Sequence, residues 1–304
     1  MADLSLIADA LVRATPLILA GLAVALAFRG GVFNIGAEGQ LLVGAAASTA
    51  TSLALADTLG SLVVVASLLS GALAGAIWAG IAAELKRRFQ VLEIISTIML
   101  NFVAIHLVSY LVRGPLQEPS RIYPQTESLS AAARLPVILP ETRLHLGFII
   151  AIGLALVLGW VLRKTAWGFR VVVTGASSRA AWSAGKVDVD RMSFRIFLLS
   201  GAIAGLAGSI EVSGVTFALY ENISPGYGYT AIAVALIAAL NPAGVIASGI
   251  FFGVLETGAI ALQRELAIPS SLASVAEAAL ILAVLTLAAY RGQSFAGLRK
   301  VISR

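Results

Sequence analysis

Apolar stretches long enough to cross a lipid bilayer recur along the whole chain of 304 residues. One helical crossing needs roughly 20 consecutive, mainly apolar residues. Of this chain, 59% is hydrophobic and 12% is charged, whereas an ordinary soluble domain has about 25% charged residues. The sequence therefore predicts an all-α, polytopic membrane protein and argues against a soluble one.

The hydropathy pattern predicts eight transmembrane segments, or nine if one short segment is counted separately. The short one, 227–240, would rise only roughly 21 Å as a helix, less than the roughly 30 Å of the hydrocarbon core. It is predicted to be a discontinuous helix or one partner of a tight hairpin. The predicted spans are 11–28, 38–55, 61–83, 93–112, 147–162, 195–219, 227–240 with a break at Asn241-Pro242 before 242–262, and 272–289.

Lysine and arginine indicate the orientation of these spans. They concentrate in the connections 84–92 and 163–195 and in the C-terminal tail. Because cytoplasmic loops carry an excess of basic residues, these regions are predicted to lie inside the cell. The connection 113–146 and the N-terminus are then predicted to lie outside.

Glycines at four-residue spacing occur in three of the predicted spans. Small residues at this spacing let helix backbones approach closely within a membrane. We therefore expect a compact bundle rather than a dimer contact at any one pair. The pairs are Gly71 with Gly75, Gly201 with Gly205, and Gly249 with Gly253.

Polar side chains interrupt the apolar pattern at two places. Asn34, Glu38 and Gln40 lie among glycines between the first two spans, and a similar Asn- and Gly-containing stretch occurs at 222–229. Polar groups at membrane depth are costly and often mark a pathway. Matching breaks in two halves of opposite orientation predict an inverted repeat. Glu38 has a second interpretation, because a carboxylate at a helix start also caps free N–H groups.

The sequence offers few residues for enzyme chemistry. It has no cysteine, and the two histidines share no metal-ligand spacing with carboxylates. Gly185-Lys186 resembles the end of a phosphate-binding loop, but Ala180 and Val187 occupy positions that need Gly and Ser or Thr. We therefore expect no metal, no cofactor and no nucleotide hydrolysis by this chain.

Acidic residues inside the predicted spans leave two interpretations open. Glu211, Glu256 and Glu277 could contact substrate or protons, or they could be hydrogen-bonded structural groups. A proton-driven carrier is expected to pair such acids with Lys or Arg inside the bundle. No predicted span carries Lys or Arg near its middle. This argues against a secondary, ion-coupled transporter, which stays open as the alternative function.

The basic connection 163–195 is predicted to contain a short helix at 175–185. Ser177 or Ser178 would cap its start and Gly185 its end. A short basic helix between two spans buries little of itself alone. It is predicted to dock into a groove of a cytoplasmic partner, or to rest on anionic lipid.

Several motifs resemble the permease subunits of ATP-binding-cassette importers. The sequence is similar to the ribose and branched-chain amino acid permease superfamily, in particular its simple-sugar and nucleoside branch. The resemblance covers roughly residues 10–290. The motifs are FNIGAEGQ at 33–40, EIISTIMLN at 93–101, the connection 168–181, and PGYGY at 225–229 followed by Asn241-Pro242.

This resemblance implies a single transmembrane permease domain over 1–304 in a bacterial plasma membrane. It implies alternating access, with a separate ATPase subunit, a second and non-identical permease, and an extracytoplasmic substrate-binding protein as partners, and no nucleic acid. Two sets of residues follow. The ATPase-coupling residues would be Ser178, Arg179, Trp182, Gly185 and Lys186; the translocation path would use Asn34, Glu38, Gln40, Ser96, Thr97, Asn101, Asn222, Tyr227 and Tyr229.

Overall fold

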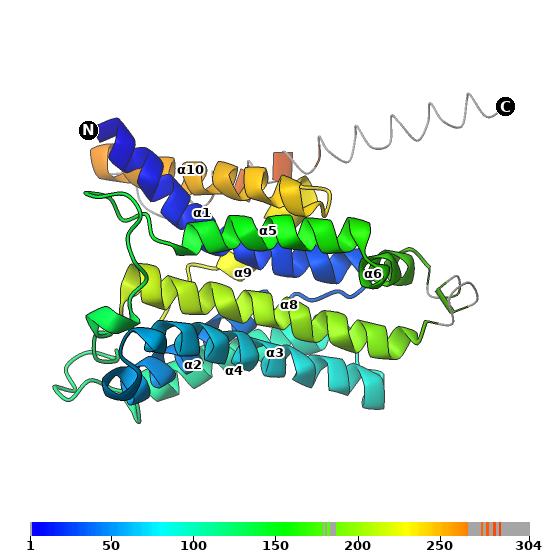
Figure 1. Cartoon of the computed structure of the whole chain (residues 1–304), viewed down its shortest axis with the longest axis horizontal. Coiled ribbons are helices and arrows are strands. Elements are labelled where there is room, and N and C mark those ends of the chain that lie inside the picture. Colours follow the sequence, from blue (N-terminus) through cyan, green and yellow to red (C-terminus); the bar gives the residue numbers. More distant parts are fainter. Residues whose placement is uncertain are drawn as a thin grey trace.

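The computed structural model of the chain is a bundle of helices (Figure 1). It describes residues 2–177, 179, 181–182 and 187–266, and positions 275, 278, 279, 282, 283 and 286. Over these residues the regular structure is helical, and the only extended pairing is two isolated bridges, Gln125 with Tyr220 and Val137 with His145. The all-α prediction is confirmed for this part of the chain.

Among the described residues, six helical segments are long and apolar enough to cross a membrane. One of them, Ala37–Phe89, consists of α2 (Ala37–Leu59), a 3-10 turn and α3 (Val63–Phe89), which fold back on each other. The hydroxyl groups of Ser52 and Ser67 join the two helices at 2.7 Å. The predicted span 272–289 and its Glu277 lie almost entirely outside the described residues. The count of eight or nine spans therefore stays a prediction.

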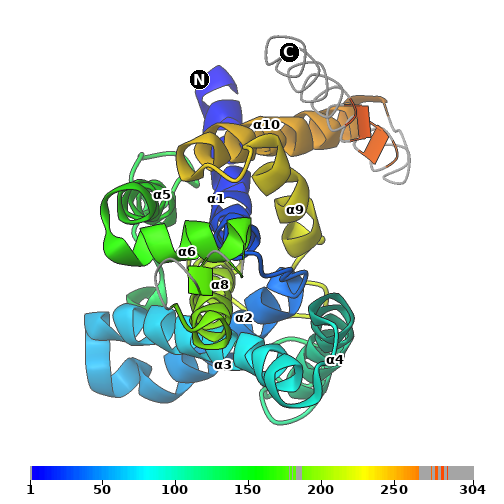
Figure 2. The same ribbon diagram turned by 90° about the vertical axis from the view of Figure 1, so that its right-hand side faces the viewer.

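Two helices form the centre of the bundle. The apolar windows of α1 (Ala2–Arg29) and of α8 (Val189–Glu211) are 83% and 78% buried, against 28% for each of the other apolar segments. Around them lie α2 and α3 together with α4 (Glu93–Arg113), α5 (Gly147–Lys164), α9 (Tyr227–Ile237) and α10 (Pro242–Leu266) (Figure 2). The central helices are therefore the ones shielded from lipid.

Both central helices begin earlier than the hydropathy pattern predicted. Helix α1 starts at Ala2 rather than residue 11, and α8 starts at Val189 rather than residue 195. The Asp188 side chain caps α8 by accepting a hydrogen bond from the Arg191 N–H at 3.0 Å. Charged residues lower the hydropathy of these first turns, but a capped helix tolerates them.

The predicted close packing at glycines is confirmed within the chain. A Cβ atom placed on Gly205 of α8 would lie 2.9 Å from the Gly75 Cα of α3, so the two backbones touch. The third pair packs similarly, because a Cβ on Gly249 of α10 would lie 3.3 Å from the Ile18 nitrogen of α1. Larger side chains would push these helices apart.

The basic residues of the connections gather at one end of the bundle, which we call the basic end. It includes the last turns of α3 and α5 and helix α6 (Ala166–Ala176). The connection after α4 and the start of α1 lie at the opposite end, which we call the distal end (Figure 1). The Asn241-Pro242 break is held at the basic end, where Arg163 donates to Asn241 Oδ1 at 3.0 Å.

The short helix α9 agrees with the predicted discontinuous segment. It has 11 residues and ends before Ala239 and Leu240, which both have positive φ, and Pro242 then starts α10. Helices α9 and α10 pack together, with the Ser248 hydroxyl donating to the Val234 carbonyl at 2.8 Å. Helix α9 is thus both short and the partner of α10 in a hairpin.

Candidate functional site

Two interruptions of helical structure meet inside the bundle. The first break, residues 30–36, separates α1 from α2, and the second break, residues 217–226, precedes α9. At their junction the Glu38 carboxylate accepts a hydrogen bond from the Gly228 N–H at 2.7 Å. Ser224 also hydrogen-bonds this carboxylate. Two stretches almost 190 residues apart in sequence are therefore in direct contact.

Glu38 lies between the N-termini of two helices. It occupies the first turn of α2 and binds the first turn of α9. Each helix start carries partial positive charge and unpaired N–H groups, so one carboxylate complements both. Gly228 permits the approach, because a Cβ atom there would lie 2.5 Å from the Glu38 Cα. Glu38 thus caps α9, a helix distant in sequence, and its charge also complements the N-terminus of its own helix, α2.

Asn34 and Gln40 form a closed pair of amides. Each donates to the carbonyl oxygen of the other at 2.9 Å, and Asn34 also accepts from the Gly36 N–H and donates to the Ser200 hydroxyl, both at 2.9 Å. Ser200 in turn donates to the Ala23 carbonyl at 2.8 Å. We call Asn34, Gln40 and Ser200 the amide brace. It joins the first break to both central helices.

Asn101 attaches α4 to the same place. Its side-chain oxygen accepts from the Gly39 N–H at 2.9 Å, and its amide donates to the Ile35 carbonyl at 3.0 Å and to the Tyr229 hydroxyl at 3.3 Å. Asn34, Glu38, Gln40, Asn101 and Tyr229, all predicted path residues, therefore lie together. Their polar groups are largely occupied by protein partners, and their role in the path stays a prediction.

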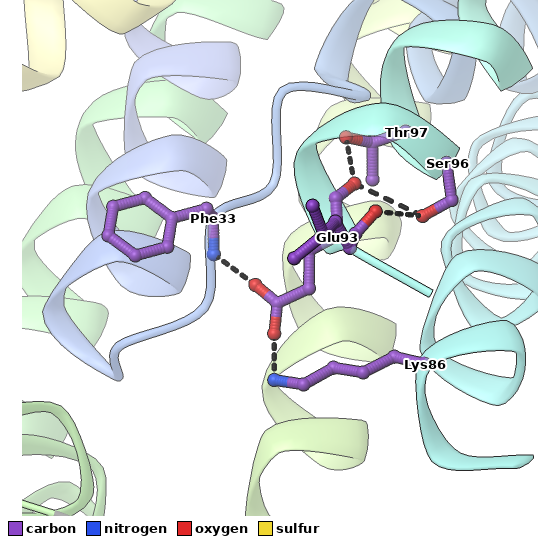
Figure 3. A network of polar contacts seen from close by, with 6 residues as sticks. Phe33, Lys86, Glu93, Ser96 and Thr97 are labelled. Carbon is purple, nitrogen blue, oxygen red and sulfur yellow. Dashed lines mark hydrogen bonds and ion pairs between the residues drawn. The ribbon is translucent and has the colours of Figure 1, made fainter. Parts of the chain in front are cut away.

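Ser96 and Thr97 satisfy their hydroxyl groups within α4. Both donate to the Glu93 carbonyl, at 3.1 Å and 2.7 Å (Figure 3). The Glu93 carboxylate reaches across to the first break, where it accepts from the Phe33 N–H at 2.6 Å, and it also pairs with Lys86 of α3. Glu93 was not among the predicted site residues. An acidic residue five positions after the basic turn at the end of α3 is the signal that could have identified it.

Helix α6 contacts the first break from the basic end. Gly31 has φ +74°, and a Cβ atom on it would lie 3.0 Å from the Gly175 Cα, so no side chain separates the two segments. The Thr165 hydroxyl caps α6 by accepting from the Gly168 N–H at 3.1 Å. Within this connection the sequence predicted a helix only at 175–185, so α6 was missed, although Thr at a helix start is a recognisable signal.

The predicted coupling residues follow α6 directly. The Ala181 N–H donates to the Ser177 carbonyl at 2.9 Å, which closes a helical turn, and Arg179 and Trp182 have helical backbone. Trp182 is 71% exposed. Ser178, Gly185 and Lys186 lie outside the described residues, so the coupling role stays a prediction.

A cavity of about 490 Å³ opens where α8 ends and α9 begins. Helices α1 and α10 complete its wall, and α8 continues beside it as a π-helix, Val212–Thr216. Of the predicted path residues, Asn222 and Tyr227 line this cavity, together with Glu211. The other predicted path residues are not in its lining.

Arg13 of α1 also lines the cavity and interacts electrostatically with Glu211. The prediction that no span carries a cation near its middle was therefore wrong. Its error came from placing the start of the first span at residue 11, whereas α1 begins at Ala2 and runs to Arg29.

The last turns of α4 and the connection after it hold the second break from the distal end. Arg113 donates from Nε and from Nη2 to the two oxygens of the Glu221 carboxylate, each at 2.7 Å. The Ser109 hydroxyl donates to the same carboxylate. The Arg113 and Ser109 hydrogen bonds lower the pKa of Glu221 to about 2. Thr126 adds a backbone pairing by donating its N–H to the Leu219 carbonyl at 2.9 Å.

His145 packs under the π-helix as a neutral group. It is 1% exposed, and a Cβ atom on Gly214 would lie 2.6 Å from its ring. Burial, followed by the charge of Arg143, lowers the pKa of His145 to about 4. Within the residues placed by the structure, no cluster of acidic, histidine or cysteine side chains could hold a metal ion.

The chain matches one family model over residues 6–287, described as the permease component of branched-chain amino acid transport systems. It is 39% identical to a glucose ABC transporter permease of Haloferax volcanii, over 91% of this chain and 75% of the relative. It is 37% identical to a guanosine ABC transporter permease of Bacillus subtilis, over 89% and 78%.

A nucleoside ABC transporter permease of Lactococcus lactis is 28% identical over 96% of this chain and 93% of the relative. No solved structure was found to match. The family model covers most of the chain, including both breaks and the cavity. The chain therefore belongs to the family of ABC transporter permease components described for branched-chain amino acid transport systems.

Proposed function

We propose that this chain imports a nucleoside or a simple sugar as the membrane subunit of an ABC importer. The named relatives support this substrate class, since they are permeases for glucose, guanosine and nucleosides. As a permease component, the chain leaves ATP hydrolysis to a separate subunit. The multi-pass bundle is proposed to lie in the bacterial inner membrane with its basic end in the cytoplasm.

The proposed assembly contains a second, non-identical permease and an extracytoplasmic binding protein. Matching permeases occur in pairs within one organism and for one substrate class, which supports the heteromeric arrangement. Bacillus subtilis has two matching guanosine permeases, and Lactococcus lactis has two matching nucleoside permeases.

One chain of contacts carries the mechanism. The segment after α6 would receive the movement of the ATPase, and α6 itself lies against the first break through Gly31 and Gly175. The amide brace connects that break to α8, and Glu38 connects it to the start of α9 at the cavity. Movement of α6 would therefore reach the cavity wall through one close backbone contact at the surface and through buried hydrogen bonds.

The meeting of the two breaks also supports the proposed inverted repeat. In transporters with such repeats, broken helices from the two halves place their ends near the middle of the membrane. Here the first break leaves from the basic end and the second from the distal end, and the starts of α2 and α9 meet at Glu38. This arrangement suits alternating access, because each break leads to a different face.

Reversing one charge in the coupling segment tests the proposal. The assembled transporter is reconstituted in liposomes with its ATPase, second permease and binding protein, and ATP-driven uptake of guanosine and glucose is measured. Arg179→Glu is expected to reduce uptake by at least tenfold and to uncouple ATP hydrolysis from the binding protein. Arg121→Glu, an exposed substitution in the distal connection, is the matched control and should transport normally.

The same liposomes separate the importer from a secondary transporter. The pair of Arg13 and Glu211 beside the cavity is the one observation that suits an ion-coupled carrier. Uptake driven by an ion gradient without ATP, and unaffected by Arg179→Glu, would contradict the proposed function.

A further inference from the structure

The cavity between α8 and α9 contains polar groups that have no hydrogen-bond partner among the described residues. Glu211 is 4% exposed and Tyr227 is 5% exposed. Neither side chain makes a hydrogen bond to any residue in the described part of the chain, although both line the cavity. Buried polar groups are normally hydrogen-bonded, so a buried carboxylate and phenol that face a cavity indicate a ligand that completes them.

The local backbone is also unusual beside Glu211. Directly after it the helix widens into the π-helix Val212–Thr216, and Phe217 follows with φ +56°. Single π-turns within helices are frequent at functional sites. The chain then stays non-helical until Tyr227, so the cavity lies between the end of one helix and the start of another. Discontinuous helices form the substrate sites of many transporters.

The charged groups in the lining of the cavity balance one another, and Glu256, outside the lining, also interacts electrostatically with Glu211. Two carboxylates, Asp9 and Glu211, and two guanidinium groups, Arg13 and Arg143, line it. A ligand with a full charge would leave one group uncompensated in a largely buried site, which is costly. A neutral ligand that forms many hydrogen bonds fits this lining better. The cavity volume of about 490 Å³ lies within the usual range for small-molecule sites.

The type of polar group narrows the ligand further. A carboxylate is an acceptor with two oxygens, so it suits two adjacent O–H donors. The Tyr227 hydroxyl and the Asn222 amide can each both donate and accept. Vicinal hydroxyl groups on a sugar ring present this combination, and hexoses and ribonucleosides share them.

We propose that Glu211, Tyr227 and Asn222 bind the transported molecule through the vicinal hydroxyl groups of its sugar ring. Glu211 accepts from the two hydroxyls, while Tyr227 and Asn222 bind the remaining oxygen atoms. Glu38 and the amide brace do not take part, because protein groups already occupy them. This inference rests on the proposed importer function and adds the residues that recognise the substrate.

Uptake competition in liposomes containing the complete transporter tests this recognition. Labelled guanosine is competed with guanosine, 2′-deoxyguanosine and glucose, and the ratio of inhibition by the first two measures recognition of the diol. Glu211→Gln keeps the size of the side chain but replaces one acceptor by a donor. It should reduce the preference for the ribonucleoside by roughly tenfold to hundredfold, the usual effect of a hydrogen bond to a charged group.

Two further variants protect the test against misfolding. Tyr227→Phe removes one hydroxyl, and Asn222→Gly removes the amide at a position with φ +58°, which glycine adopts without strain. Both should raise the KM for guanosine several-fold at normal protein level. Glu127→Gln, in the exposed distal connection, is the control carboxylate and should leave KM and preference unchanged.

The outcomes separate the two proposals. ATP-driven uptake with unaltered KM and ribose preference in Glu211→Gln and Asn222→Gly would overturn the assignment of this cavity and leave the importer function standing. The same binding protein is present in every sample, so its own selectivity cancels in the comparison. Failure of the wild-type transporter to take up any of these solutes would overturn both. Competition by glucose as well as guanosine would extend the diol site to hexoses, and competition by guanosine alone would restrict it to nucleosides.

Discussion

The two breaks in helical structure look alike in sequence and differ in what their polar groups do. Asn34 in the first break is bound to Gln40, Gly36 and Ser200. Asn222 in the second break is exposed and has no side-chain hydrogen bond within the structure as described. The first break is therefore a brace, whereas the second lines a cavity. The difference shows that polar residues at membrane depth identify a break in helical structure. They do not indicate whether that break binds other parts of the protein or a ligand.

The largest effect is expected from removing the centre of the amide brace. Asn34→Ala leaves the Gln40 amide and the Gly36 N–H without partners in a buried place and removes the donor to the Ser200 hydroxyl, at a cost of about 3 kcal/mol or more. Thermal unfolding in detergent should show a much lower midpoint and a low protein level in the membrane. Asn222→Gly is the matched control and should keep wild-type stability. A stable Asn34→Ala protein that cannot transport would instead place Asn34 in the path.

A smaller loss is expected at the junction of the breaks. Glu38→Gln keeps a carbonyl acceptor for the Gly228 N–H but removes the charge between two helix starts, a loss of about 1–2 kcal/mol. Uptake should fall only in proportion to protein level, measured together in the same membranes. Normal protein level with abolished uptake would show that Glu38 contacts substrate.

Tyr229→Phe should lower the stability of the protein less than Glu38→Gln does. The Tyr229 hydroxyl accepts one long hydrogen bond from Asn101, at 3.3 Å, and its ring is 42% exposed. Loss of this contact should cost about 0.5–1 kcal/mol, with a wild-type KM for substrate. Tyr227→Phe provides the comparison, because it should change KM rather than stability. The reverse result would assign substrate contact to Tyr229 rather than to Tyr227.

The smallest effect concerns pH and the distal clamp on the second break. The pKa of Glu221 is lowered from 4.5 to about 2 by Arg113 and Ser109, so its stabilising contribution is complete above about pH 4.5 and is lost as the pH falls towards 2. Between pH 7 and 5.5, the thermal stability of the wild-type protein should therefore exceed that of Arg113→Gln by a constant amount. Below pH 4.5 the difference should shrink. A difference that changes between pH 7 and 6 would show that another group is responsible.

Within the described residues, hydropathy located the apolar helices but misjudged their ends. The predicted span 93–112 agrees with α4, Glu93–Arg113, because apolar residues fill that helix almost to its ends. Helices α1 and α8 extend further, since partial burial lets Asp9 and capping lets Arg191 belong to a helix. Helix α6 was missed because it is too short to produce a transmembrane signal.

The site was predicted as a set of residues rather than as an arrangement. The sequence singled out Glu38 and left substrate contact and capping open, and it considered capping only of the helix that Glu38 itself starts. The helix it hydrogen-bonds is α9, which begins almost 190 residues later. Arg13 was overlooked because its relation to Glu211 depends on how α1 packs beside α8.

The sequence by itself determined the class of protein, the positions of the breaks and the resemblance to importer permeases. Those properties depend on local composition, since a bilayer crossing needs a continuous apolar run and a break needs glycine, proline or amides. The tertiary structure decided which break is a brace and which lines a cavity. Hydrogen-bond satisfaction is a property of contacts between distant segments, such as Asn34 with Ser200, and local sequence contains no information about those contacts.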